Sequence, residues 1–256
     1  YESGREPMAG RNWPAREDQQ GMVQINNAWW AGGAISRLSL NRQIGQMAAQ
    51  LLQVSGVYMW HDQLLYKPPA RSRTLSGNIG WHQDWNYWQV CDHADLITAW
   101  VALNDVNTQN GAMMVIPGSH RGEVLPHVDR YHEDNMLTRG QEITRGVKET
   151  DAVLMPLEPG QISIHNYRIA HASGPNNSRD KRIGVSMHFM PPDTEQIVGN
   201  WDSATLVRGE DRQGNFEPTP IPAKDFDPLA VEFQQKAARA MSEVLYAGAE
   251  RNTAKL

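Results

Sequence analysis

A series of short apolar segments between Val57 and Pro191, each ended by a turn signal, is the feature that most limits the fold. Strand-length segments separated by Pro and Gly turns are typical of antiparallel sandwiches and barrels. The candidate strands are 57–60, 63–67, 96–103, 112–116, 162–165 and 182–190. The predicted turns are Pro68-Pro69, Asn110-Gly111, Pro117-Gly118, Pro159-Gly160 and Gly174-Pro175. The sequence therefore predicts a mainly β fold.

Residues in the segment 182–190 alternate in character. Side chains in a strand point alternately to its two faces, so every second residue shares an environment. One face carries Arg182, Gly184, Ser186 and His188, and the other carries Ile183, Val185, Met187 and Phe189. The segment 96–103 behaves likewise, with Thr98, Trp100 and Ala102 on its mixed face. We expect a sheet whose aliphatic face is covered by helices and whose mixed face lines a cavity.

Helical periodicity occurs on either side of this β region. In residues 40–53, Ile44, Met47, Ala48, Leu51 and Leu52 recur at helical spacing, and Gly56 follows as a stop signal. A second helix is predicted over 228–248, with Asp227 as its cap and Pro228 in its first turn. Its expected buried stripe is Leu229, Phe233, Ala237, Met241, Val244 and Leu245.

These patterns fit one domain over 1–256. We divide it into a helical or irregular N-terminal part (1–56, with 1–32 irregular), a core (57–191) and a C-terminal extension with a helix (192–256). Residues 121–151 are charged and poorly periodic, so they fit a mobile lid or a solvated surface insertion equally well.

Composition excludes several classes of protein. The chain has 256 residues, 21% charged, with a net charge of −5 and no basic run that would bind nucleic acid. No apolar stretch approaches the roughly 18 residues of a membrane helix. Cys91 is the only cysteine, which precludes an intramolecular disulfide and favours the cytoplasm. Because the chain begins at Tyr1 rather than Met, we expect further sequence upstream.

Three residues form a candidate metal site. His82 and Asp84 are separated by one residue, so on a strand they would face the same side. His171 follows 89 positions later and supplies a second imidazole. Two histidines and one carboxylate leave three coordination positions open, an arrangement diagnostic of non-haem Fe(II) oxygenases. Two positions suit a chelating 2-oxoacid and the third suits O2. The His-x-Asp pattern alone also arises by chance.

A candidate anion site follows the second histidine. Arg182 lies eleven residues after His171, at the start of a predicted strand. A guanidinium can hold a carboxylate through two parallel hydrogen bonds, so Arg182 suits the far carboxylate of 2-oxoglutarate. Ser173 shares a face with His171 and is expected to donate a further hydrogen bond.

Several segments, in this order along the chain, resemble the phytanoyl-CoA dioxygenase family. They are Leu65-Tyr66-Lys67-Pro68-Pro69, Trp81-His82-Gln83-Asp84, Ala99-Trp100-Val101-Ala102-Leu103-Asn104-Asp105, Asn110-Gly111-Ala112, Val115-Ile116-Pro117-Gly118-Ser119-His120-Arg121 and His171-Ala172-Ser173-Gly174-Pro175-Asn176. The resemblance implies a double-stranded β-helix, a cupin-like jelly-roll barrel flanked by helices.

The resemblance also implies a set of roles. Iron would be bound by His82, Asp84 and His171, and 2-oxoglutarate would be held by Arg182 and Ser173, with Trp100 beside it and Lys67 at the border of the pocket. Because halogenating relatives replace the metal-binding carboxylate with a small residue, Asp84 disfavours halogenation. His120 is expected in a structural turn, and the remaining histidines have no spacing that demands a metal.

The expected function is oxidation, above all hydroxylation, of a C–H bond of a small molecule, with release of succinate and CO2. Trp85, Trp88 and His188 are the candidate substrate contacts. Two alternatives remain open: a jelly-roll metalloenzyme of another class, such as an isomerase or hydrolase, and a non-catalytic binding module. The sequence does not identify the substrate or the oligomeric state.

Overall fold

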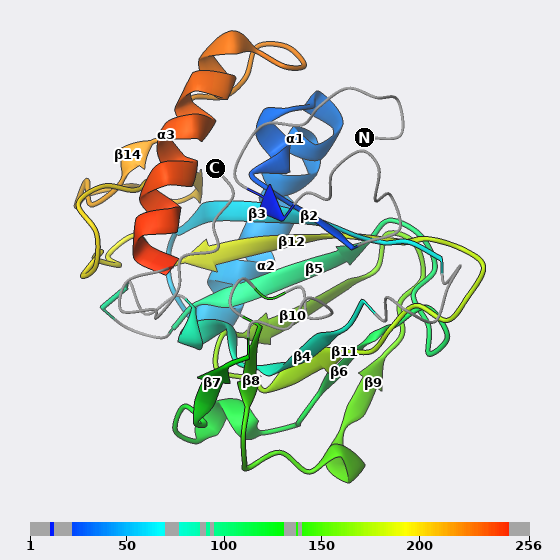
Figure 1. The fold of residues 1–256 in the computed structure, drawn as a ribbon. Coiled ribbons are helices and arrows are strands. Elements are labelled where there is room, and N and C mark those ends of the chain that lie inside the picture. The colour runs from blue at the N-terminus through cyan, green and yellow to red at the C-terminus, as the bar shows by residue number, and fades with distance from the viewer. Residues whose placement is uncertain are drawn as a thin grey trace.

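Two sheets face each other in the computed structural model, which describes residues 11–12, 22–69, 77–87, 91–92, 95–130, 137 and 140–245 (Figure 1). The large sheet has the order β1-β2-β3-β12-β5-β10, and β13 pairs with both β3 and β14. Its strands are β1 (Arg11–Asn12), β2 (Val23–Asn26), β3 (Val57–Lys67), β5 (Ile97–Ala102), β10 (Ile162–Asn166), β12 (Arg182–Met190), β13 (Ser203–Arg208) and β14 (Glu217–Pro218).

The small sheet has the order β4-β11-β6-β9, and β7 pairs with β8 in a separate hairpin. The strands are β4 (Ile79–His82), β6 (Met113–Val115), β7 (His127–Asp129), β8 (Gln141–Ile143), β9 (Val153–Met155) and β11 (His171–Ser173). From β3 to β12 the chain passes repeatedly between the two sheets, which is the winding of a double-stranded β-helix. The predicted fold is confirmed.

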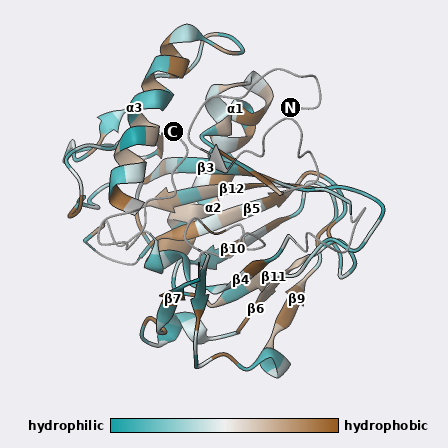
Figure 2. Cartoon of the chain, viewed as in Figure 1, coloured by the Kyte–Doolittle hydropathy of each residue, from teal (hydrophilic) through white to brown (hydrophobic). Residues whose placement is uncertain are grey.

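Helices cover the aliphatic face of the large sheet, as the alternation of β12 predicts. These helices are α1 (Gly33–Ser39), α2 (Arg42–Leu52) and α3 (Pro228–Leu245). The chain also has four short 3-10 turns: η1 (Ala28–Trp30), η2 (Asp84–Asn86), η3 (Ser119–Arg121) and η4 (Glu149–Asp151). One cluster unites Val185, Met187 and Phe189 of β12 with Ile44 and Ala48 of α2. Figure 2 shows hydrophobic colouring along the central strands and mainly hydrophilic loops. The other face of the large sheet is thereby left for the cavity.

Local sequence explains how α2 begins. The side chain of Asn41 accepts hydrogen bonds from the backbone N–H groups of Gln43 (2.9 Å) and Ile44 (3.4 Å). Such caps satisfy donors that have no partner within the helix. Asp227 does the same for α3, accepting from Leu229 N–H at 3.1 Å, so the predicted cap is confirmed.

Four expectations need correction. The candidate strands 57–60 and 63–67 form one continuous strand, β3. Residues 23–26 are not irregular: they form β2 and pair with β3, so the large sheet extends beyond 57–191. Residues 33–39 form α1, which the periodicity missed. On α3, Leu229 is 71% exposed, whereas the expected Phe233, Ala237, Met241 and Val244 pack against the core.

The buried carboxyl group of Asp62 makes the stability of the fold depend on pH. Its buried carboxylate accepts a hydrogen bond from the Ser39 hydroxyl at 2.6 Å and contacts Trp29 N–H at 3.4 Å. Burial outweighs these bonds and raises the pKa of Asp62 from 3.8 to about 7. Because the folded state then holds this proton more tightly than the unfolded state, the contribution of Asp62 to stability falls as pH rises through this range.

We expect Asp62 to contribute a decrease of up to about 4 kcal/mol in the free energy of unfolding between about pH 4 and pH 7, opposite in sign to the contribution of the buried His61, His171 and His188. In urea titrations, Asp62→Asn should remove this contribution from the pH dependence of the wild type, whereas Asp193→Asn, at an exposed position, should not. An unchanged slope in Asp62→Asn would show that the carboxyl group is not the cause.

Candidate metal and anion site

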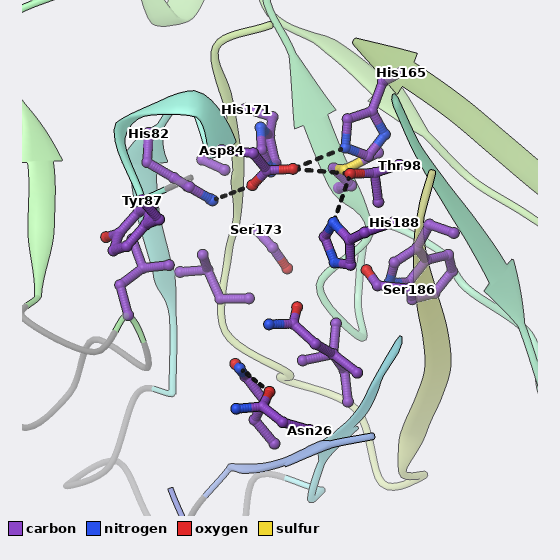
Figure 3. Close-up of a pocket in the computed structure, with 18 of the residues that line it drawn as sticks. Asn26, His82, Asp84, Tyr87, Thr98, His165, His171, Ser173, Ser186 and His188 are labelled. Atoms are coloured by element: carbon purple, nitrogen blue, oxygen red, sulfur yellow. Dashed lines mark hydrogen bonds and ion pairs between the residues drawn. The ribbon is translucent and has the colours of Figure 1, made fainter. Parts of the chain in front are cut away.

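The three predicted metal ligands meet at one end of a cavity between the sheets. His82 ends β4, His171 begins β11, and the two residues are register partners in the small sheet. Asp84 Oδ1 lies 3.4 Å from His82 Nε2 and 3.6 Å from His171 Nε2 (Figure 3). One ligand atom from each residue lies within 4.8 Å of the others, close enough for one metal ion. The structure therefore brings together residues 89 positions apart in the chain.

Backbone carbonyls orient both imidazole rings. His82 Nδ1 lies 2.8 Å from the Gly80 carbonyl oxygen, and His171 Nδ1 lies 3.1 Å from that of Ile169. If each Nδ1–H donates to its carbonyl, each Nε2 presents a lone pair to the centre of the site. Burial, together with the neighbouring His82, lowers the pKa of His171 to about 3, which favours the neutral ring that binds metals.

The second oxygen of Asp84 is held by the large sheet. The Thr98 hydroxyl donates to Asp84 Oδ2 at 3.0 Å, and His165 Nε2 lies 3.7 Å from the same oxygen (Figure 3). Burial alone would raise the pKa of Asp84, but His171, His165 and His82 beside it lower the pKa well below its usual value. The carboxylate is therefore ionised and directs Oδ1 toward the two histidines.

Asp84 reaches this position by a route that the sequence did not predict. The strand ends at His82, and Asp84 opens the 3-10 turn η2, so the expected strand spacing of the pair is wrong. The buried Gln83 fixes the turn between them. Its side chain donates to the Arg168 carbonyl at 2.5 Å and accepts from Leu125 N–H at 2.7 Å.

A buried cationic cluster marks another part of the cavity. Arg182 Nη1 donates to the Gly111 carbonyl at 2.7 Å and to the Ser173 hydroxyl at 3.2 Å, and its guanidinium lies 5.3 Å from the Trp100 ring centroid. Arg182 Nε is buried without a hydrogen-bond partner. Among the described residues, no carboxylate pairs with Arg182 or Lys67, although they are 2% and 1% exposed. Buried cations without an acidic partner call for an anion.

Lys67 takes a different position from the one expected. It does not line the cavity but lies behind Ser173, donating to the Ser173 hydroxyl at 2.7 Å and to the Gly174 carbonyl at 2.5 Å. Burial, and then the charge of Arg182, lowers the pKa of Lys67 well below its usual value. Lys67 therefore positions Ser173 rather than contacting a ligand in the cavity.

The three candidate substrate contacts differ in where they lie relative to the cavity. His188 lines the cavity, where its Nδ1 lies 2.6 Å from the Tyr167 hydroxyl. Trp85 does not line it, because its side chain packs against a separate buried cluster that includes Tyr58 and Trp60. Trp88 lies outside the described residues.

Beside the metal ligands, the cavity residue that the sequence analysis missed is His165. Tyr87, which follows the metal-binding segment and was expected at the edge of the cavity, lines it. In β10, Ile162 and Ile164 pack toward the helices. Because side chains alternate along a strand, Ser163 and His165 face the cavity side of the sheet. The alternation used for β12 would have found His165 if it had been applied to this strand.

Two further expectations concern neighbouring segments. His120 lies in the turn η3, where its carbonyl accepts from Arg168 Nη2 at 2.7 Å, as a structural role predicts. Within 121–151, the described residues include the β7–β8 hairpin and Leu137, which lines the cavity, whereas 131–136 and 138–139 lie outside the described residues. The lid stays a prediction.

Gly184 provides a test of the packing beneath the anion site. A Cβ atom there would lie 2.0 Å from Trp100 Cζ2, so Gly184→Ala forces the indole away from Arg182. We expect a loss of about 1–3 kcal/mol of stability, as for other overpacked sites. Thermal unfolding should show it, and Gly32→Ala, where nothing lies within 4 Å of the added atom, should stay near wild type. An unchanged midpoint for Gly184→Ala would contradict this packing.

A sequence profile of the phytanoyl-CoA dioxygenase (PhyH) family matches residues 36–184, more than half of the chain. The chain belongs to the phytanoyl-CoA dioxygenase family. This confirms the resemblance seen in the sequence. The match contains all three candidate metal ligands and the residues of the cationic cluster.

Curated relatives of this phytanoyl-CoA dioxygenase family protein match about half of the chain. A "Probable alpha-ketoglutarate-dependent hypophosphite dioxygenase" of Stutzerimonas stutzeri is 26% identical over 145 residues, 56% of this chain and 48% of the relative. The peroxisomal phytanoyl-CoA dioxygenase of Homo sapiens is 27% identical over 137 residues, 54% of this chain and 40% of the relative. The chain thus spans about half the length, or less, of these relatives.

A solved structure agrees over most of the fold of this phytanoyl-CoA dioxygenase family member. The non-heme monooxygenase ThoJ in its apo form superposes with a TM-score of 0.74 at 30% identity, covering 87% of this chain and 79% of that chain. A ThoJ–Ni complex superposes with a TM-score of 0.68 at 26% identity, covering 92% and 83%. The jelly-roll assignment therefore stands on both topology and superposition.

Proposed function

We propose that this chain is an Fe(II)- and 2-oxoglutarate-dependent oxygenase that hydroxylates a C–H bond of a small molecule. The observation that supports this most strongly is one cavity lined both by a His-Asp-His cluster and by a buried arginine without an acidic partner. Relatives named as 2-oxoglutarate-dependent dioxygenases agree with it. The reaction would release succinate and CO2.

The described residues fit a ferrous ion. His82, Asp84 and His171 supply two neutral nitrogens and one carboxylate oxygen, a donor set that suits iron. Thr98 and the carbonyls of Gly80 and Ile169 hold these ligands from behind. When bound, iron with 2-oxoglutarate and O2 supplies the oxidising chemistry, and the protein supplies orientation and a cavity screened from water.

The cationic cluster fits the far carboxylate of 2-oxoglutarate. Arg182 and Ser173 line the cavity, and Arg182 Nε is an N–H donor without a partner. The Ser173 hydroxyl donates to the Gly111 carbonyl at 2.8 Å and accepts from Arg182 and Lys67, so its role is to position the guanidinium. Trp100 forms a wall beside Arg182. Burial lowers the pKa of Arg182 only to about 10, so the guanidinium stays charged at neutral pH. These groups would hold the co-substrate while its other end reaches the metal.

The rival functions do not account for this cluster. An isomerase or hydrolase on the same fold needs no buried cation site for an oxoacid, and a non-catalytic module needs no complete set of metal ligands. Formation of succinate from 2-oxoglutarate separates the possibilities. We expect it to require Fe(II) and O2, and to stop when Zn(II) replaces Fe(II). No succinate from the Fe(II)-loaded protein in air would refute the proposal.

We also infer a cytoplasmic location, supported by the single, buried Cys91. Within the described residues, no helix has the length and apolar character needed to cross a bilayer.

A further inference from the structure

One wall of the cavity is used by neither the metal nor the anion site. On the cavity face of the large sheet, Asn26 of β2 pairs with Gln63 of β3, and Gln63 pairs with Ser186 of β12. Ser186 in turn pairs with Trp100 of β5. Gln24 lies two residues before Asn26, on the same face of β2. Figure 3 shows Asn26 at the opposite end of the pocket from Asp84.

These side chains offer hydrogen bonds that the protein does not use. Gln24 donates to Asn26 Oδ1 at 2.9 Å. Among the described residues, the one acceptor of Asn26 Nδ2 is the Met241 sulfur at 3.8 Å, a weak acceptor. Within the described residues, no hydrogen bond is made by the Gln63 carboxamide or the Ser186 hydroxyl. Gln24, Asn26 and Gln63, here termed the carboxamide cluster, therefore present free donors and acceptors to the cavity.

The charge of the lining narrows the class of ligand. Among the described lining residues, Asp84 is the only acid and Arg182 the only lysine or arginine, and both are assigned above. Besides the uncharged Ser186, the lining includes the apolar side chains Leu65, Ile79, Met113 and Met241. A charged group would have no counter-ion here, so the ligand is uncharged at this point, with an apolar body.

The geometry points to an amide of the substrate as the group bound by the carboxamide cluster. A carboxamide carries an N–H donor and a C=O acceptor side by side, so it pairs with another amide through two hydrogen bonds. We propose that this pairing selects the substrate and aims one of its C–H bonds at the metal, an inference that rests on the proposed function. Gln24, Asn26 and Ser186 all lie outside the family match of 36–184.

The register of the strands gives an approximate distance between the amide group of the substrate and its oxidised carbon. The row Asn26–Gln63–Ser186 lies two residues along the strands from His188 and Thr98, whose hydroxyl contacts Asp84. This step is about 7 Å, and Gln63 is two strands from β5, about 10 Å across the sheet. The amide and the oxidised carbon would thus be separated by on the order of 10 Å.

Matched small probes test the inference with the full chain. Butanamide, butan-1-ol, butanoate and butylamine share one body and differ in the polar group, and their affinities can be measured by ligand-observed NMR. The protein is used both alone and with Zn(II) and 2-oxoglutarate. We expect butanamide to bind about fivefold more tightly than butan-1-ol in both forms, the scale of one or two net hydrogen bonds. The same preference over butanoate and butylamine is expected once 2-oxoglutarate and Zn(II) occupy the anion and metal sites.

Variants locate the binding. Gln63→Leu should abolish the preference for butanamide, and Gln63→Glu, which keeps the shape, should transfer it to butylamine. Gln46→Leu, on the exposed face of α2, should bind as wild type does. Equal affinity for amide and alcohol, no binding of butanamide, or an unchanged preference in Gln63→Leu would each overturn the inference. Because the probes are also measured without metal, these outcomes are independent of succinate formation, which tests the proposed function.

Discussion

Asp84→Ala is expected to lose tight binding of divalent metal and to lower succinate formation more than about 100-fold, since even the partners of metal ligands contribute 10- to 100-fold. The reason is geometric. Asp84 Oδ1 is the only described carboxylate oxygen that faces both His82 Nε2 and His171 Nε2. Without it, two neutral imidazoles remain, and the site loses its one anionic ligand.

Metal affinity can be measured with Mn(II) by electron paramagnetic resonance, beside the succinate assay. Asp105→Asn, at an exposed position after β5, is the matched control and should retain both properties. Thermal unfolding of Asp84→Ala without metal separates a lost ligand from a lost fold. Wild-type affinity for Mn(II) in Asp84→Ala would show that the metal binds elsewhere.

Arg182→Leu is expected to raise the KM for 2-oxoglutarate by about 100-fold while leaving Mn(II) affinity nearly unchanged, because loss of a buried charged partner costs about 2–5 kcal/mol. The guanidinium already donates to the Gly111 carbonyl and the Ser173 hydroxyl, so its orientation is fixed before any ligand enters. The effect should fall on the co-substrate, since Arg182 makes no hydrogen bond or ion pair with the three metal ligands in the described part of the chain.

Arg179→Leu, on the exposed loop before β12, serves as the matched control for charge. It should leave the KM for 2-oxoglutarate as it is in the wild type. Equal KM values for Arg182→Leu and wild type would show that the far carboxylate of 2-oxoglutarate binds outside the cationic cluster, even if the metal site were correct.

The sequence predicted most accurately what depends on alternation. In β12 it separated Val185 and Met187, which face the helices, from Ser186 and His188, which face the cavity. The reason is that a buried strand between a core and a polar cavity repeats with a period of two residues, and that period is visible without coordinates.

The sequence failed where the position of a residue depends on its partner. Asp84 lies in a 3-10 turn because Gln83 is bound by Arg168 and Leu125, and neither contact has a local signal. Lys67 resembled a ligand contact, yet its ammonium group is turned behind Ser173. Such long-range hydrogen bonds form only once distant strands have paired.

Strand β2 shows the same limit at the end of the sheet. Its residues Gln24 and Asn26 reach the cavity only because β2 pairs with β3, from which it is separated by two helices in the sequence. A four-residue strand in a polar region carries little periodicity of its own. The proposed amide-binding wall was therefore invisible before the sheet order was known.

The most direct test of the account is an anaerobic titration of the Fe(II)-loaded wild-type protein with 2-oxoglutarate, followed by visible absorption. We predict a weak charge-transfer band that saturates at one 2-oxoglutarate per chain, is absent from Asp84→Ala, and needs far more 2-oxoglutarate in Arg182→Leu. No band in the wild type, or an equal band in Asp84→Ala, would contradict the proposal that His82, Asp84 and His171 hold iron beside an oxoacid bound by Arg182.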